Sequence, residues 1–143
     1  MPRFVDNSPP GVCIFCRIVA GELPAARVFE DDLTLAFMDL GQVNPGHVLV
    51  ATRRQVETVM ELDEVDAAHL FAVATRIAKA VQAEFRPTGM TLLQTNKPDG
   101  WQTVPHVHVH VLPRHADDGV GLVWPRKDPP LAELQALAAR IRL

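Results

Sequence analysis

The sequence predicts an α+β fold that combines an antiparallel sheet with one long helix and a C-terminal helix. Three observations lead to this fold class. The 143 residues are the length of one globular domain. Two β-favouring runs lie close enough together to pair locally, and a long helical pattern separates the first three such runs from the last two. This order fits an antiparallel sheet better than the regular alternation of strands and helices that a parallel sheet requires.

The chain is expected to begin with a flexible arm and a short helix. Residues 1–12 contain three Pro and one Gly before any periodic pattern starts, which is typical of a loosely held segment. Residues 13–20 form a short apolar segment closed by Gly21, and this pattern predicts a helix of about two turns with a glycine cap. We place residues 13–143 in a single domain, because the sequence contains no repeat and no linker long enough to separate two domains.

Three strands are predicted before the long helix. The β-favouring runs at 27–30 and 34–38 flank Asp31-Asp32-Leu33 and therefore predict a hairpin. Asn44-Pro45-Gly46 is a strong turn signal, and the apolar run at 47–51 that follows it predicts a buried strand. Because the edges of an open sheet need covering or pairing, we expect a homodimer formed through the sheet or a helix.

The longest helix is predicted over residues 63–85. Asp63 is a good N-cap, apolar residues recur at helical spacing, and Pro87 and Gly89 stop the pattern. The remaining elements are two strands and a terminal helix that follows Pro129-Pro130, and they are predicted at 91–95, 104–112 and 131–141.

Composition and charge exclude several classes of partner. Lys and Arg total 14 against 17 Asp and Glu, a formal net charge of −3, which argues against a broad basic face for polymeric nucleic acid. No apolar run approaches the length of a membrane span, and the first eleven residues lack the apolar core of a secretory signal. We therefore expect a cytoplasmic protein with no nucleic-acid polymer and no membrane as partner.

Three histidines alternate with valines in the most informative segment of the chain. In a strand, successive side chains point to opposite faces, so His106, His108 and His110 should share one face. Imidazoles placed in this way can bind an anion, donate a proton, attack an electrophile or bind zinc. A polar outer strand face is the alternative without function. His69 in the long helix and His115 in a polar loop are interpreted as structural or exposed.

Residues 102–112 (QTVPHVHVHVL) resemble the signature of the histidine triad family, His-φ-His-φ-His-φ-φ, where φ is apolar. The resemblance extends to 44–50 (NPGHVLV), 37–39 (FMD) and 13–24 (CIFCRIVAGELP), and so covers most of residues 13–124. It implies an α+β fold with a five-stranded antiparallel sheet, a homodimer, and a nucleotide hydrolase or transferase. In such proteins the middle histidine attacks the α-phosphate, and water then releases the nucleoside monophosphate from a covalent nucleotidyl-histidine.

The resemblance also assigns roles to residues of this chain. The nucleophile is His108, and His110 and His47 bind or polarise the phosphate oxygens. A purine nucleotide is the expected substrate and AMP the expected product. Further contacts with the nucleotide are expected from four polar residues: Asp39, Asn96, Gln102 and Thr103. Asp39 is expected to accept hydrogen bonds from the ribose hydroxyls. Its alternative role is that of a turn cap only.

Cys13 and Cys16 have the spacing of half a zinc site or of a redox pair. In the zinc-binding branch of the family, two such cysteines join the first triad histidine, here His106, and a second histidine whose position is occupied by Gln55. Glutamine is a weak zinc ligand beside thiolates, so a closed structural site is expected to be incomplete and the cysteines to be reduced thiols, with a structural zinc as the less favoured alternative. The resemblance implies that catalysis requires no cofactor, with imidazoles and backbone donors stabilising the transition-state charge.

The sequence does not decide between two classes of substrate. Dinucleoside polyphosphates are one expectation, and nucleoside phosphoramidates or AMP esters are the other. Trp101 stands where the family usually has Gly, and its ring can stack on a base or restrict the leaving group. Trp124 resembles a late tryptophan that contributes to the active site across the dimer or packs in the interface. Two alternatives are a nucleotide-binding signalling module with incidental turnover and a hydrolase that uses the three histidines as metal ligands.

Overall fold

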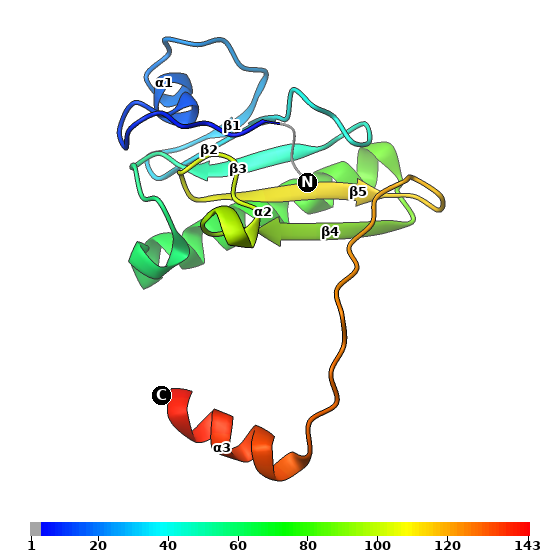
Figure 1. Ribbon diagram of the computed structural model, residues 1–143. Helices are drawn as coiled ribbons and strands as arrows, with labels where there is room; N and C mark the ends of the chain where they lie inside the picture. The colour runs from blue at the N-terminus through cyan, green and yellow to red at the C-terminus, as the bar shows by residue number, and fades with distance from the viewer. Residues whose placement is uncertain (1–3) are drawn as a thin grey trace.

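The computed structural model describes residues 4–143 and has the predicted α+β architecture (Figure 1). Five antiparallel strands form one sheet in the order β1-β2-β3-β5-β4. The strands are β1 (Arg27–Glu30), β2 (Thr34–Met38), β3 (Val48–Thr52), β4 (Gly89–Gln94) and β5 (His108–Arg114). The helices are α1 (Ile14–Val19), α2 (Glu64–Phe85) and α3 (Leu131–Ile141), with short 3-10 turns η1 (Val59–Glu61) and η2 (Pro98–Gly100).

Local signals in the sequence place most of these elements. The Asp31 carboxylate accepts the N–H groups of Leu33 and Thr34 at 3.0 and 2.9 Å, which closes the predicted hairpin. The Asp63 carboxylate accepts the N–H of Asp66 at 2.8 Å and caps α2 as predicted. At the other end of α2, Arg86 adopts a left-handed conformation with φ of 49°. The helix therefore ends just before Pro87.

Strand β5 begins at His108, so the prediction that it starts at Val104 is wrong. Pro105 has no N–H to contribute to a strand ladder. The chain turns there, with the N–H of His106 bonded to the carbonyl of Val104 at 2.8 Å. The N–H of Val107 donates to the carbonyl of Val56 at 2.8 Å, and regular pairing starts only with the next residue. Smaller shifts move β3 to 48–52 and β4 to 89–94.

The centre of the sheet is buried on both faces, because each face carries its own apolar cluster. Helix α2 packs its buried stripe, which includes Val73 and Ile77, against one face, where Val107, Val109 and Val111 of the β5 segment point. The opposite face packs against α1 through a cluster that includes Phe15 and Phe37. The central strand β3 is consequently buried at all five positions. The histidines that alternate with the valines must therefore face α1.

The two ends of the chain differ in their attachment to this body. The N-terminal segment is tied down at Asp6, whose N–H donates to the carbonyl of Thr103 at 2.7 Å and whose carboxylate accepts the N–H of Ile14 at 2.7 Å. The predicted flexible arm also includes residues 1–3, which lie outside the described residues. Figure 1 shows α3 apart from the sheet at the end of an extended segment, and none of its residues is buried. Across residues 4–143, no helix combines the length and apolar character needed to cross a membrane.

Gly46, in the turn before β3, is a position where adding a side chain should destabilise the fold. Its φ is +100°, and an added Cβ would lie 2.7 Å from the ring of Phe85. Gly46→Ala should lower the free energy of unfolding by about 2–4 kcal/mol, through backbone strain together with overpacking. Urea denaturation measures the change. Gly121→Ala is the matched control, since an added Cβ there meets no atom within 4 Å, and equal stability of the two variants would contradict this account.

Candidate active site

The triad histidines meet on the α1 side of the sheet, as the alternating pattern predicts. Phe15 of α1 packs edge-on against His106 and His108, with ring centroids 5.8 and 4.9 Å apart. The rings of His108 and His110 are 5.1 Å apart. His108 is buried, whereas the side chain of His110 is 24% exposed, so a solute approaches the row from the His110 end.

A backbone hydrogen bond selects the tautomer of His108. Its Nδ1 lies 2.7 Å from the carbonyl oxygen of His106. Because a carbonyl oxygen only accepts, Nδ1 must carry the proton. In the neutral ring, Nε2 then keeps its lone pair. His108 therefore presents a nucleophilic nitrogen at Nε2.

A second chain of hydrogen bonds orients His110. The N–H of Val43 points at Nδ1 of His47 at 3.4 Å, so the proton of His47 is on Nε2. That Nε2 lies 2.9 Å from Nδ1 of His110 and donates to it. The remaining nitrogen of His110, Nε2, then carries a proton that is available to an anion. The pair thus prepares a hydrogen-bond donor beside the nucleophile.

Burial keeps these imidazoles neutral near pH 7. Desolvation lowers the pKa of His108 to about 4. It also lowers the pKa of His110 to about 4, with positive charge on His108 and His47 adding to the effect. The pKa of His47 is lowered by burial as well, although the nearby carboxylate of Asp39 opposes that shift. Neutral rings are the form that the two tautomer assignments require.

Asp39 lies beside the histidine pair at the end of β2. Its Oδ2 is 3.4 Å from Nε2 of His47 and 3.9 Å from Nδ1 of His110, while Oδ1 accepts the N–H of Gly41 at 2.7 Å. The turn-cap interpretation is therefore correct for one oxygen, and the other oxygen faces the site. Its contact with a ribose stays a prediction.

The amide side chains predicted to contact nucleotide are engaged with the protein itself. Gln102 donates to the carbonyl of Glu57 at 2.6 Å and accepts the N–H of Lys97 at 2.8 Å. Asn96 accepts the N–H of Val59 at 2.7 Å and donates to the side chain of Gln94 at 2.7 Å. Both residues anchor the loop around η2. Each amide nitrogen carries two N–H donors and uses one of them in these bonds, so contact of the other with a phosphate stays a prediction.

Two neighbouring residues complete this loop. Thr103 accepts the N–H of Asp6 through its carbonyl, and its hydroxyl role stays a prediction. Trp101 adopts φ of 73°, the left-handed region that favours glycine, and is 49% exposed. The backbone thus keeps a glycine-like conformation although the residue is a tryptophan. Its ring is presented at the surface rather than packed in the core.

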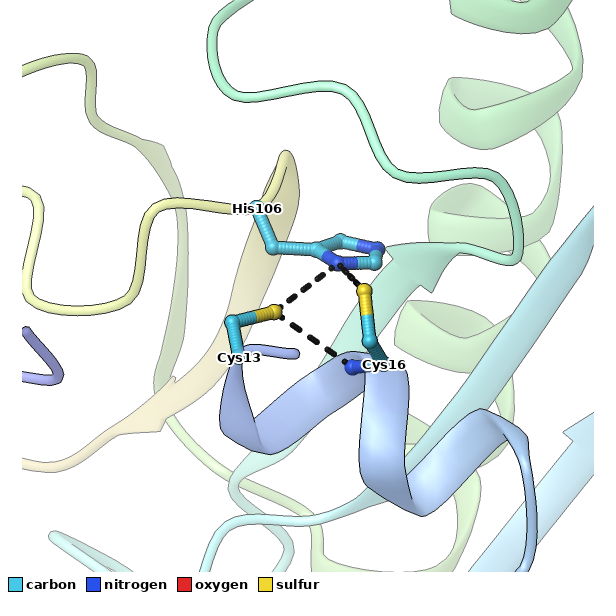
Figure 2. A group of neighbouring side chains, drawn as sticks. All are labelled: Cys13, Cys16 and His106. Atoms are coloured by element: carbon cyan, nitrogen blue, oxygen red, sulfur yellow. Dashed lines mark hydrogen bonds between the residues drawn. The ribbon is translucent and has the colours of Figure 1, made fainter. Parts of the chain in front are cut away.

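His106 belongs to a separate cluster with the two cysteines (Figure 2). Its Nε2 lies 2.6 Å from the carbonyl of Thr52, while its Nδ1 is 3.4 Å from the sulfur of Cys13 and 3.4 Å from that of Cys16. Burial and the neighbouring Cys13 raise the pKa of the Cys16 thiol to about 12. Both nitrogens of His106 are directed at these groups, so the three triad histidines do not converge on one metal.

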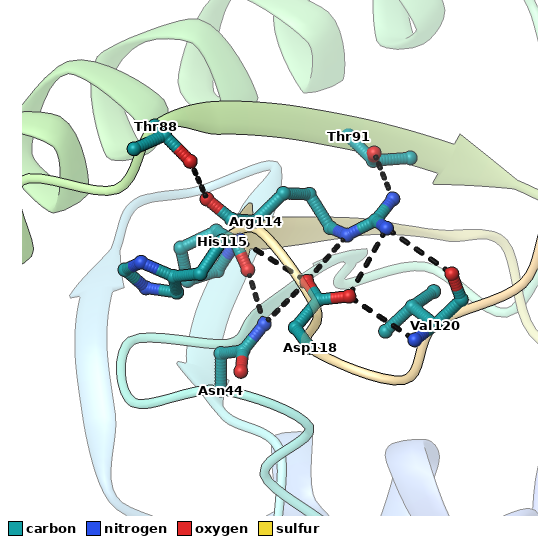
Figure 3. A network of polar contacts seen from close by, with 8 residues as sticks. Asn44, Thr88, Thr91, Arg114, His115, Asp118 and Val120 are labelled. Atoms are coloured by element: carbon teal, nitrogen blue, oxygen red, sulfur yellow. Dashed lines mark hydrogen bonds and ion pairs between the residues drawn. The ribbon is translucent and has the colours of Figure 1, made fainter.

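A polar network that the sequence did not predict fixes the loop before His47 (Figure 3). The Asp118 carboxylate, nearly buried, accepts from Nε of Arg114 at 2.8 Å and from Asn44 at 3.0 Å. Asn44 also donates to the carbonyl of Pro113 at 2.8 Å. The Arg114 guanidinium and these donors hold the pKa of Asp118 well below its usual range. Asn44 was recognised only as a turn residue, and nothing local in the sequence marks Asp118 as its partner.

A comparison with family models identifies one match, described as the HIT domain, over residues 20–117. Among curated relatives, the adenosine 5'-monophosphoramidase hnt1 of Schizosaccharomyces pombe is 32% identical over 130 residues, covering 90% of this chain and 95% of that protein. A crystal structure of a HIT family protein from Bacillus anthracis has a TM-score of 0.89 at 38% identity and covers 93% of this chain and 96% of the other. A Zn-bound histidine triad family protein from Mycobacterium smegmatis has a TM-score of 0.73 at 31% identity, covering 91% and 95%.

The lowered pKa values predict how stability depends on pH. Imidazoles in the unfolded chain titrate near pH 6.5, above the folded pKa of about 4 for His108 and His110. Between these values the unfolded chain binds more protons, so the stability present above about pH 6.5 is lost as the pH falls. Urea denaturation from about pH 7 to about pH 5, above most carboxyl titration, measures this loss. His110→Gln should make the dependence shallower, and a wild-type stability that is constant over this range would contradict the assignment.

Proposed function

The chain belongs to the histidine triad (HIT) family of nucleotide hydrolases, and we propose that it cleaves AMP-containing substrates at the α-phosphate through a covalent intermediate on His108. One observation carries this proposal. The 2.7 Å bond from Nδ1 of His108 to the carbonyl of His106 leaves a lone pair on Nε2, inside a site that keeps the ring neutral. Hydrolases of this family generally need no cofactor, and each step below uses the imidazoles alone.

In the first step, Nε2 of His108 attacks the α-phosphorus. A P–N bond forms, the bond from phosphorus to the leaving group breaks, and the leaving group departs with the bonding pair and takes up a proton from the solvent. Negative charge on the phosphoryl oxygens is stabilised by the Nε2–H of His110, whose orientation His47 fixes at 2.9 Å. In the second step, water attacks the same phosphorus and releases a proton to the solvent, the P–N bond breaks, and AMP leaves while the neutral imidazole is restored.

His47 acts in this scheme as a positioning residue. It is buried, its Nε2 donates to His110, and the Asp39 carboxylate lies 3.4 Å from that same nitrogen. This role differs from direct polarisation of phosphate oxygens by His47, because its nitrogens are already engaged.

Phosphoramidates and AMP esters are the substrates that we favour. Support comes from the relatives named adenosine 5'-monophosphoramidase, of which the S. pombe protein matches 90% of this chain. A dinucleoside polyphosphate is the second candidate, and the exposed ring of Trp101 favours it because that ring can stack on a second base. A nucleotide-binding module without meaningful turnover would use the same residues, and only turnover distinguishes it from an enzyme.

We also propose a cytoplasmic homodimer. Strand β4 lies at the sheet edge, and beside it an apolar groove is lined by residues of α2 and β4 that include Leu70, Phe71 and Leu92. Phe71 is 60% exposed. A free edge strand next to an apolar groove suits a second copy related by a two-fold axis, since antiparallel pairing of two β4 strands is self-complementary. The two neighbouring cysteines, Cys13 and Cys16, are free thiols, which suits a reducing compartment.

Loss of the nucleophile tests the proposed chemistry. His108→Ala should lower release of AMP from an adenosine phosphoramidate and from a diadenosine polyphosphate by at least about 10⁴-fold, while AMP still binds. Liquid chromatography of the products and calorimetry with AMP measure the two effects. His69→Gln is the matched control, because His69 pairs with Asp31 on another part of the fold. Equal turnover by wild type and His108→Ala would overturn the mechanism, and failure of the wild type on both substrates would favour the binding module.

A charge placed in the apolar groove tests the dimer. Phe71→Glu should shift the protein from dimer to monomer, because pairing would bury an uncompensated carboxylate. Light scattering after size-exclusion chromatography gives the mass. Val28→Glu places the same charge on the opposite edge strand, β1, where the residue is also exposed, and should leave the dimer intact. Dissociation by both variants, or by neither, would contradict the proposed interface.

A further inference from the structure

Four electron-pair donors converge in the cluster formed by Cys13, Cys16 and His106. Besides the two sulfurs and Nδ1 of His106, the Oε1 of Gln55 lies 3.3 Å from the sulfur of Cys13, 2.8 Å from that of Cys16 and 3.0 Å from Nδ1 of His106. The four atoms come from three separate segments of the chain, at α1, the loop after β3 and the turn before β5. Figure 2 shows the two sulfurs directed at the same nitrogen of the His106 ring, Nδ1.

The surrounding hydrogen bonds fix which atoms of Gln55 and His106 face the cluster. The amide N–H of Gln55 donates to the carbonyl of Pro105 at 2.7 Å, so its oxygen must point inward. Nε2 of His106 donates to the carbonyl of Thr52 at 2.6 Å, so the neutral ring turns the lone pair of Nδ1 inward. Two acceptors therefore face each other at 3.0 Å, and only the two thiol protons can serve them.

The two thiol protons allow this cluster to bind a divalent cation without a change in its net charge. One M²⁺ replaces the two thiol protons, which leave as 2 H⁺, and the net charge of the cluster does not change. A zinc ion with Zn–S near 2.3 Å and Zn–N or Zn–O near 2.0–2.2 Å needs donor separations of roughly 3.3–3.8 Å. The observed separations of 2.8–3.4 Å need an expansion of only a few tenths of an ångström at most edges.

We propose that Gln55 Oε1 is the fourth ligand of a site for a thiophilic divalent cation, with Cys13, Cys16 and His106 as the other three. The sequence-based expectation of an incomplete site overlooked that the Pro105 carbonyl orients this amide. A neutral amide oxygen binds such a cation more weakly than imidazole or carboxylate does. Cys16 is also only partly buried. The metal is therefore exchangeable, unlike the ion of a buried structural site whose four ligands are all thiolates or imidazoles.

A cation bound at this site would help to hold the nucleophile in place without entering its chemistry. The carbonyl of His106, whose imidazole is a ligand, accepts from Nδ1 of His108. Phe15, between the two cysteine ligands, packs edge-on against His108 at 4.9 Å. A bound cation would connect α1 to residue 106 and so hold both contacts in place. This inference concerns metal affinity and stands whether or not the proposed hydrolase activity is correct.

Substitutions at Gln55 test the ligand assignment with the metal alone as probe. Zn²⁺ is titrated into the full chain, freed of metal and reduced, in competition with a chromophoric chelator. Affinity should rank Gln55→His above Gln55→Glu, then wild type, then Gln55→Ala, with at least about tenfold lost in the alanine variant. Co²⁺ should give the intense visible bands of a tetrahedral thiolate site in wild type and weaker bands in Gln55→Ala.

A glutamine far from the cluster serves as the control. Gln82→Ala changes an exposed glutamine on α2 and should leave zinc affinity unchanged. Circular dichroism of each metal-free variant tests whether it is folded. If Gln55→Ala is unfolded, Gln55→Glu, which retains the size of the side chain, replaces it in the test. Wild-type affinity in Gln55→Ala, or no gain in either Gln55→His or Gln55→Glu, would overturn the assignment of Gln55. Failure of wild type to bind one Zn²⁺ per chain would overturn the site.

Discussion

The hydrogen bond between Nδ1–H of His108 and the carbonyl of His106 is the contact on which the remaining site geometry depends. It fixes the tautomer of the central histidine, and it does so with a backbone group that cannot change its protonation. That carbonyl is available because the chain turns at Pro105 and enters β5 only at His108. Residue 106 therefore serves two sites, with its carbonyl toward the nucleophile and its imidazole toward the cysteines.

Burial provides the second constraint. Isolated imidazoles at neutral pH are partly protonated, yet the site needs one ring with a free lone pair and another with a defined N–H. The sheet is covered on both faces, so desolvation lowers the pKa of His108 and His110 to about 4. Neutral rings can then form an ordered chain of donors, from Val43 through His47 to His110. The apolar packing of α1 and α2 thus determines the chemistry of groups on β5.

Loops attached to the sheet hold the remaining polar groups. Gln42 clamps the turn before β3 by accepting the N–H groups of Gly46 and His47 and donating to the carbonyl of His47. Asp118 joins the same turn to the end of β5 through Asn44. These bonds set the separation of His47 and His110, which neither strand determines alone. The amides of Gln102 and Asn96 do the same for the η2 loop, which explains why they contact protein before any nucleotide.

The sequence by itself determined the fold class, the hairpin, the cap of α2 and the shared face of the histidines, because each follows from local periodicity, turn chemistry or capping. The resemblance to the histidine triad family also identified His47, Asp39 and the cysteines as neighbours of the triad. Only the tertiary structure decided which nitrogen of each ring is free, that His47 is engaged with His110, and that Gln55 Oε1 faces the cysteines. Those facts depend on contacts between segments far apart in the chain, such as Gln55 with Pro105 and Asn44 with Asp118. Hydrogen-bond partners of this kind leave no periodic signal in the sequence.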